Sequence, residues 1–316
     1  MIITKLKTNR ISNPLGYSLG VRPRLSYVVT DTEAKKQTAA RYEVALDEAF
    51  STVVFDSGKR ADIDSLSFEL PIQLLPRTRY YWRVEVWADN GDYAVSPIAW
   101  FETAKLDEPW MAKWIVPDMD KEHHPVLGRT FKLDGTIASA RAYVCGLGLY
   151  EMQINGMKAG DEYFAPHFNA YHKWLQYQTY DVTGLLLEGD NRVEISLGNG
   201  LYKGRFGFDG HSKELYGSEF ALLCEIRVTY ADGTTEVLTS DTEWTAKRSR
   251  VMAGNLYDGE VYDATFAAEE TYAVREGELG YDRLTARLSL PVVVKEERKP
   301  IEVIHTPAGE TVLDIG

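Results

Sequence analysis

Short β-prone runs alternate with Gly, Asn and Asp turns between residues 145 and 217, and this alternation limits the possible folds more than any other feature of the chain. Residues 150–154 alternate apolar and polar side chains as a half-buried strand does. Asn155-Gly156 follows at once and supplies the two positive-φ positions of a tight hairpin turn. A second aromatic and β-branched run covers residues 176–182, and Gly-Asp-Asn at 189–191 marks a further turn. The pattern predicts a β-sandwich.

The first hundred or so residues carry the same kind of signal. Aromatic or β-branched residues alternate with polar ones at residues 25–29, 41–46 and 80–87, and Gly, Asn and Pro separate these runs. Turn signals at strand-length intervals are typical of an immunoglobulin or fibronectin type III sandwich. We therefore expect such a domain over residues 1–104, with the rings of Tyr80 and Trp82 in its core.

Several motifs along the chain carry a resemblance to a known family. The clearest are Asn13-Pro14-Leu15-Gly16, Asp56-Ser57-Gly58, Leu75-Pro76-Arg77-Thr78, Gly146-Leu147-Gly148, Asn155-Gly156, Gly189-Asp190-Asn191 and Gly198-Asn199-Gly200. With these motifs the chain resembles the N-terminal, non-catalytic region of bacterial α-L-rhamnosidases, which are glycoside hydrolases. Leu201 stands where that family commonly has Trp, and His167-Phe168 stands where it commonly has Gly-Trp.

The resemblance implies an all-β chain in three parts. A fibronectin type III- or immunoglobulin-like sandwich over residues 1–104 is followed, after a short linker, by a larger jelly-roll-like sandwich over residues 105–291. Residues 292–316 resume a strand-like pattern and stop within it, which we interpret as the start of a further, truncated β domain. In the family an α-helical barrel with the catalytic carboxylates follows. We therefore expect an α-L-rhamnosidase as the parent protein, its barrel as a partner in the same polypeptide, and an inactive fragment here.

Composition and charge argue against several classes of partner. The chain has 316 residues, 44% of them hydrophobic and 26% charged, which is typical of a globular protein with two or three cores. The net charge of −12 argues against a nucleic-acid partner. No apolar run approaches the ~20 residues that cross a bilayer, so we expect no membrane partner. The first residues lack the apolar segment of a signal peptide, which predicts a cytoplasmic location.

The sequence predicts no catalytic residues. Glycoside hydrolysis needs two carboxyl groups across the scissile bond, and Glu260 and Asp263 lie close together in an aromatic setting. Positions three apart on a strand point to opposite faces, so we interpret this pair as structural. The histidines follow no metal-ligand spacing, and Gly198-Asn199-Gly200 is interpreted as a turn with no helix after it. Cys145 and Cys224 are expected to be buried free thiols.

Sugar binding remains as a function for the second sandwich. A pyranose site combines an aromatic face with a few amides or carboxylates, and loops 166–174 and 202–209 offer that mixture. The candidate residues are Asp161, Asn169, Tyr171, Tyr202, Lys203 and Asp209. The resemblance extends to calcium-dependent rhamnose-binding modules, which makes Ca²⁺ a candidate ligand of the oxygens of Asp161, Asn169 and Asp209. It also makes a rhamnosylated glycan or glycoside the expected partner.

Two alternatives stay open from the sequence. The same aromatic residues and glycines would also shape the sandwich and its contact with a catalytic domain. The chain would otherwise be a free-standing carbohydrate-binding or adhesion protein with no enzymatic partner. If the two loops form one sugar site, the loop of Asn169 and the loop of Asp209 must approach one another.

Overall fold

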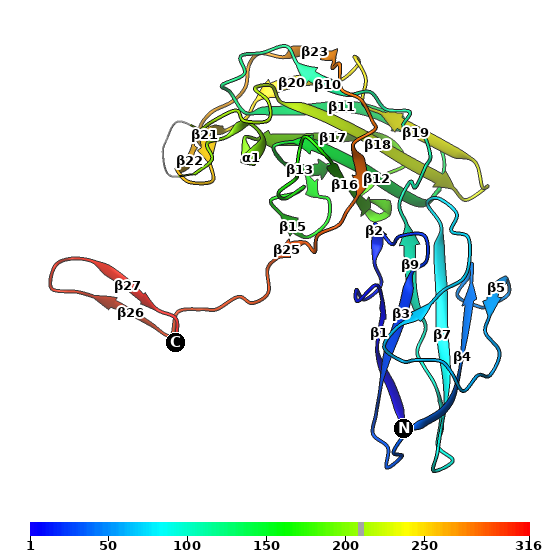
Figure 1. Cartoon of the computed structure of the whole chain (residues 1–316). Helices are drawn as coiled ribbons and strands as arrows, with labels where there is room; N and C mark the ends of the chain where they lie inside the picture. Colours follow the sequence, from blue (N-terminus) through cyan, green and yellow to red (C-terminus); the bar gives the residue numbers. More distant parts are fainter. Residues whose placement is uncertain (208–211) are drawn as a thin grey trace.

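The computed structural model describes residues 1–207 and 212–316, and nearly all of its regular structure is β-strand (Figure 1). In the described residues, the exceptions are a 3-10 turn, η1 (Thr183–Leu185), and one turn of α-helix, α1 (Gly200–Lys203). The all-β prediction is confirmed. The expectation that no helix follows Gly198-Asn199 is wrong, because α1 begins at Gly200. Across this described part, none of the helical segments has the length and apolar character required to cross a bilayer.

The N-terminal sandwich consists of two sheets. The larger has the order β2-β9-β7-β4-β5, with β8 also paired to β7, and the smaller has the order β1-β3-β6. The strands are β1 (Ile2–Thr8), β2 (Leu15–Tyr17), β3 (Arg24–Thr30), β4 (Gln37–Ala45), β5 (Val53–Asp56), β6 (Phe68–Glu69), β7 (Arg79–Ala88), β8 (Tyr93–Val95) and β9 (Ala99–Thr103). Alternate residues of β7 point inward, so Tyr80 and Trp82 are buried in the core as predicted, and Val84 is buried beside them.

One long sheet forms the second sandwich by wrapping around a shared core. Its order is β14-β13-β17-β11-β20-β23-β10-β18-β12-β16-β24, and β19 pairs with β18. The strands are β10 (Ile115–Pro117), β11 (Pro125–Leu133), β12 (Ile137–Leu147), β13 (Leu149–Ile154), β14 (Met157–Lys158), β16 (Leu175–Asp181), β17 (Gly189–Gly198), β18 (Ala221–Tyr230), β19 (Thr235–Thr239), β20 (Thr245–Arg248), β23 (Tyr272–Glu276) and β24 (Leu284–Ala286). Cys145 and Cys224 are buried free thiols in this sandwich, as expected.

The Asn155-Gly156 turn joins β13 to β14 as a two-residue hairpin loop. Both residues have positive φ, 52° for Asn155 and 78° for Gly156, and Ile154 pairs with Met157 across the turn. Asn155 also holds the turn in place, because its Nδ2 donates to Leu185 O and its Oδ1 accepts from the backbone N–H of Arg192. The hairpin predicted from sequence is confirmed.

The connection between the two sandwiches is buried. Lys105 follows β9, and its Nζ donates to Glu225 Oε1 at 2.6 Å, with the side chains only 1% and 0% exposed. The backbone N–H of Met111 donates to the other oxygen of Glu225, and the ring of Trp110 covers the ammonium group at 4.9 Å. A buried ion pair of this kind needs a fixed geometry, so the linker anchors one sandwich to the other.

Three small two-stranded pairs complete the fold. They are β15 (Glu162–Tyr163) with β25 (Val292–Val293), β21 (Val251–Asn255) with β22 (Gly259–Tyr262), and β26 (Glu302–His305) with β27 (Thr311–Asp314). The β26–β27 hairpin stands away from both sandwiches (Figure 1). The limits 1–104, 105–291 and 292–316 stay predictions, and β25 lies against β15 of the second sandwich.

Candidate functional site

A cavity of about 480 Å³ opens beside β13, β17 and the β21–β22 hairpin in the second sandwich. Its lining combines exposed aromatic rings with carboxylates and amides. Its aromatic and polar residues include Tyr163, Phe164, Glu151, Glu260, Asn199 and His124. We take this cavity as the candidate site because it joins the two kinds of group that a sugar requires.

The aromatic side of the cavity comes from the end of β15. Tyr163 is 45% exposed and Phe164 is 57% exposed, so their rings are open to a ligand. Lys158 Nζ lies 3.6 Å from the centre of the Tyr163 ring and 2.9 Å from Glu151 Oε2. The ammonium group therefore holds the ring and the carboxylate on the same side of the cavity.

The polar side of the cavity is set by the segment that leads into α1. Asn199 Nδ2 donates to Gly254 O at 2.9 Å, which ties the end of β17 to β21. His124 is buried, and burial together with the nearby charge of Lys203 lowers its pKa, so the ring is neutral at neutral pH. The site therefore offers two amides, an imidazole and two carboxylates, and no Lys or Arg is among the described residues that line it.

Two of the sequence candidates lie in the protein interior. Tyr171 is buried, and its ring centre lies 5.1 Å from that of Tyr202 and 4.9 Å from that of Tyr216. Asn169 is buried too, and its Oδ1 accepts from both the backbone N–H and Nε2 of Gln176 at 3.1 Å. The two loops do approach one another through Tyr171 and Tyr202, but the faces of these rings already pack against protein.

The remaining candidates are scattered. Asp161 is exposed in the turn before β15, and Lys203 is buried with Nζ 3.4 Å from Asn199 Oδ1. Burial lowers the pKa of Lys203. Asp209 lies outside the described residues. Within the described part, Asn169 Nδ2 and Tyr171 Oη have no hydrogen-bond partner, so polar groups are left in this region that a small ligand or water would satisfy.

The oxygens expected to bind Ca²⁺ do not form a ligand set in the described part of the chain. Asn169 Oδ1 is occupied by two hydrogen bonds from Gln176. No group of three or more His, Cys, Asp or Glu side chains that could hold a metal occurs among residues 1–207 and 212–316. Ca²⁺ takes six to eight oxygen ligands, and Asp209, the third expected ligand, lies outside the described residues, so Ca²⁺ binding stays a prediction.

The carboxylates of Glu260 and Asp263 have separate surroundings. Asp263 Oδ1 accepts from Thr265 Oγ1 at 2.6 Å and from the backbone N–H of the same residue at 2.8 Å, and these hydrogen bonds lower its pKa. Glu260 instead lines the cavity from β22. The structural interpretation of Asp263 agrees with this geometry.

Sequence reasoning missed the aromatic pair that lines the cavity. Tyr163 and Phe164 directly precede the loop that was singled out, and their exposure depends on how β15 is held. Glu162 provides the anchor, because its carboxylate accepts from Tyr180 Oη at 2.5 Å and from the guanidinium of Arg287. An aromatic pair beside an acidic residue was the available signal, but contacts made far along the chain decide which way the rings point.

Two family models match the chain. One, described as the α-L-rhamnosidase N-terminal domain, covers residues 135–304. The other, described as a Rha78A-like N-terminal immunoglobulin domain, covers residues 3–107. The matches agree with the division into two sandwiches that the strands show.

Curated relatives and solved structures are similar to the chain. An α-L-rhamnosidase of Formosa agariphila is 28% identical over 99% of the chain but only 37% of its own length. An α-L-rhamnosidase of Streptomyces avermitilis is 35% identical over 57% of the chain and 18% of its own length. The crystal structure of an Aspergillus terreus α-L-rhamnosidase is 28% identical with a TM-score of 0.85, covering 99% of this chain and 38% of that one. A Streptomyces avermitilis α-L-rhamnosidase solved in complex with L-rhamnose shares the fold at a TM-score of 0.88 and 22% identity, over 99% of this chain and 48% of that one.

Proposed function

The chain belongs to the α-L-rhamnosidase family through its N-terminal domain, and from this we propose that it is the non-catalytic N-terminal region of an α-L-rhamnosidase. The observation that carries the proposal is a difference in length: the chain is matched almost from end to end, yet it spans 37% of the Formosa agariphila relative. We propose that hydrolysis of α-L-rhamnosides belongs to a catalytic barrel in the same polypeptide. The two sandwiches support that barrel.

The exposed apolar side chains of the β26–β27 hairpin favour the proposal that further polypeptide contacts this hairpin. Val303 pairs with Leu313 on one face and Ile304 pairs with Val312 on the other, and all four side chains are exposed. An isolated two-stranded hairpin is marginally stable in water, and clustered exposed apolar side chains are typical of interaction surfaces. A domain that covers this hairpin would bury both apolar faces.

We further propose that the cavity of the second sandwich binds L-rhamnose-containing glycans. L-Rhamnose carries a methyl group in place of a hydroxymethyl group, so one edge of the sugar is apolar. Tyr163 and Phe164 offer rings for that edge, and Glu151 and Glu260 offer acceptors for its hydroxyl groups. Proposed subsite residues from the sequence, Asp161, Asn169, Tyr171, Tyr202, Lys203 and Asp209, define a competing position that the same experiment tests.

Hydrolysis of an aryl α-L-rhamnoside tests whether the activity belongs to the catalytic barrel and not to the two sandwiches. The 316-residue chain is expected to release no phenol, because we assign the acid and base of hydrolysis to the catalytic barrel, whereas the product of the whole gene is expected to release it. Turnover by the purified 316 residues would overturn the proposal, and so would an inactive whole protein. A reading frame that stops after Gly316 would favour the alternative, a free-standing carbohydrate-binding or adhesion protein.

Calorimetry with L-rhamnose, with and without Ca²⁺, tests the sugar site. A shallow monosaccharide site predicts a dissociation constant on the order of millimolar to tens of micromolar. Phe164→Ala should abolish the heat of binding, while the matched control Phe168→Ala should not, because Phe168 is equally exposed but lies outside the cavity. Loss of binding in Asp209→Ala instead would move the site to the sequence-predicted loops. No heat in any condition would leave the second sandwich as a support alone.

A further inference from the structure

A second, strongly polar cleft of about 330 Å³ lies where the two sandwiches meet. One wall comes from β7 and β9 of the first sandwich and the other from β12 and β18 of the second. Four arginines and one glutamate line it, together with hydroxyl groups. The lining residues are Arg77, Arg79, Tyr81, Glu102, Ser139, Ala140, Arg141, Tyr143, Arg227 and Thr229. Four guanidinium groups thus lie close together in a protein whose net charge is −12.

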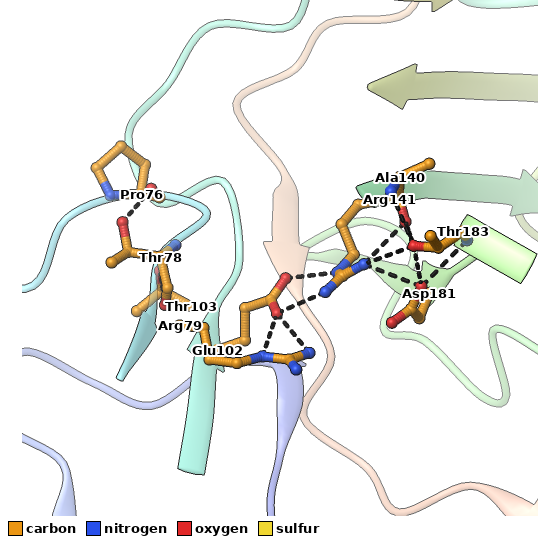
Figure 2. Close-up of polar contacts among 9 residues, drawn as sticks. All are labelled: Pro76, Thr78, Arg79, Glu102, Thr103, Ala140, Arg141, Asp181 and Thr183. Carbon is orange, nitrogen blue, oxygen red and sulfur yellow. Dashed lines mark hydrogen bonds and ion pairs between the residues drawn. The ribbon is translucent and has the colours of Figure 1, made fainter. Parts of the chain in front are cut away.

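Three of the four arginines have carboxylate partners. Figure 2 shows Glu102 between Arg79, which belongs to its own sandwich, and Arg141, which belongs to the other. The ion pairs are Arg77–Glu108, Arg79–Glu102, Arg141–Glu102 and Arg141–Asp181. These contacts fix the shape of the cleft, so their arginines are accounted for as structural groups.

Arg227 is different. It makes no ion pair or side-chain hydrogen bond within the described residues, and its Nε is buried without a partner. The charge of Arg227 contributes to lowering the pKa of the Glu108 carboxyl group. The main cause of that lower pKa, however, is the hydrogen bond from Arg77. The cleft therefore contains one guanidinium group that has no carboxylate partner among the described residues and whose Nε is unsatisfied.

The strand register adds an independent observation. Arg227 of β18 lies directly opposite Arg141 of β12, so two like charges face the cleft side by side. Like charges directly opposite one another on neighbouring strands destabilise a sheet. The pairs on either side of them put Ser139 opposite Thr229 and Tyr143 opposite Glu225. Glu102 and Asp181 already compensate the charge of Arg141, so an anion bound to Arg227 would compensate the remaining charge.

We propose that this cleft binds the carboxylate or sulfate group of an acidic saccharide. The planar guanidinium fork of Arg227 matches an oxyanion with two parallel hydrogen bonds. Hydroxyl groups of Ser139, Thr229 and Tyr81 line the same cleft and are suited to the hydroxyl groups of a sugar. The volume lies at the lower end of the range for small-molecule sites, ~300–1,000 Å³, which suits a single sugar unit. This site is separate from the cavity beside β13 and does not depend on the proposed rhamnose binding.

Calorimetry at low ionic strength tests the proposal on the 316-residue chain. The probes are D-glucuronate, D-glucose 6-sulfate, neutral D-glucose and inorganic sulfate. Heat of binding is expected for both charged sugars and not for glucose, and the affinity should fall as salt is raised because the ions screen the attraction. Arg227→Gln should weaken binding of the charged sugars at least about tenfold, since it removes a charge-assisted hydrogen bond. The affinity of Arg227→Lys for the charged sugars should lie between those of the original chain and Arg227→Gln. Lysine keeps the positive charge but cannot donate the two parallel hydrogen bonds of a guanidinium group.

The matched control is Arg192→Gln. Arg192 is an exposed arginine of β17 that pairs with Glu194 and lies outside the cleft, so this variant should bind like the original chain. The midpoint temperature of thermal unfolding of Arg227→Gln should be unchanged or slightly raised, because the substitution breaks no ion pair. Failure of both charged sugars to bind, or equal binding by Arg227→Gln, would overturn the proposal. Inorganic sulfate that binds as tightly as the charged sugars would overturn its saccharide part.

Discussion

Glu162 anchors β15, the strand that leads to the aromatic side of the cavity. Its carboxylate is buried, accepts from Tyr180 and Arg287, and lies 3.5 Å from His167 Nε2. Burial by itself would raise the pKa of Glu162, but the interactions with His167, Arg287 and Tyr180 outweigh burial and hold the pKa below its usual value of 4.5. The same contacts position Tyr163 at the rim of the cavity.

Glu162 therefore predicts an acid-sensitive part of the stability. Because its pKa is lower in the folded than in the unfolded chain, its contribution is present above about pH 4.5 and is lost as the pH falls through the folded pKa. Glu162→Gln should lower the free energy of unfolding at pH 7 by about 3 kcal/mol, since it leaves Arg287 buried without its partner. It should also flatten the dependence of this free energy on pH below about 4.5. Urea unfolding between pH 7 and pH 3 measures both effects.

The exposed Glu188→Gln is the control for that measurement, because its side chain lies on the surface. It should keep the acid dependence of the original chain. If Glu162→Gln and the original chain lost stability in parallel on acidification, Glu162 would not be the titrating group.

At the scale of elements, the strands differ in how much packing supports them. β18 is buried along most of its length between β10, β12 and β19. Among the described strands, β26 and β27 pair with one another alone, and their apolar side chains are exposed. Local stability follows the number of buried apolar contacts, so the hairpin should open far more easily than the sandwich core.

Two isoleucine substitutions test this difference. Ile226→Ala, in the core on β18, should cost about 2–5 kcal/mol because it leaves a cavity among packed side chains. Ile304→Ala, on the exposed hairpin, should change the free energy of unfolding by less than about 0.5 kcal/mol. Chemical unfolding of the two variants gives the comparison. A cost above about 1 kcal/mol for Ile304→Ala would show that the hairpin packs against the sandwiches, contrary to the structure.

At the scale of the whole molecule, a close contact joins the two sandwiches beside the buried linker. Gly16 of β2 has a φ of +67°, and a Cβ placed on it would lie 2.1 Å from Thr179 Oγ1 of β16. Glu102 bridges Arg79 and Arg141 nearby (Figure 2). The relative orientation of the sandwiches therefore depends on a glycine that lets the two backbones approach and on an ion pair that spans them.

Gly16→Ala and Gly20→Ala separate backbone strain from this contact. Both glycines have nearly the same positive φ, but a Cβ on Gly20 meets nothing within 4 Å. Gly20→Ala should cost about 1 kcal/mol from backbone strain alone, and Gly16→Ala should cost at least about 1 kcal/mol more because Thr179 must move. Small-angle scattering should show a changed domain orientation for Gly16→Ala only. Equal effects of the two variants would show that the sandwiches do not touch at Gly16.

The fold was predictable from sequence to a large extent because its signals are local. Alternation along residues 80–87 and 150–154 and the Asn155-Gly156 turn depend only on neighbouring residues, and each formed the strand or hairpin expected. The helical turn at Gly200 was missed because Gly-Asn-Gly is a strong turn signal. In the structure Gly200 lies close to Leu149 of β13, and a Cβ placed on it would lie 3.0 Å from Leu149 Cγ.

The candidate site could not be predicted to the same degree. Tyr171 and Asn169 have the chemistry of a sugar site, but the fold turns both inward, where Tyr216 and Gln176 already use the ring face and the amide oxygen. Composition describes what a side chain can bind. It does not say which other residues of the same protein contact that side chain in the folded state.

The sequence by itself determined the all-β class, the strand pattern, the tight turn and the family, because periodicity, turn chemistry and motifs are written in consecutive residues. Only the tertiary structure decided where the candidate cavities lie. Phe164 reaches a cavity that Glu260 completes, and Arg79, Arg141 and Arg227 meet in one cleft, although many residues separate them along the chain. The physical reason is that a binding site is a set of side chains brought together by packing, and packing is decided by long-range contacts.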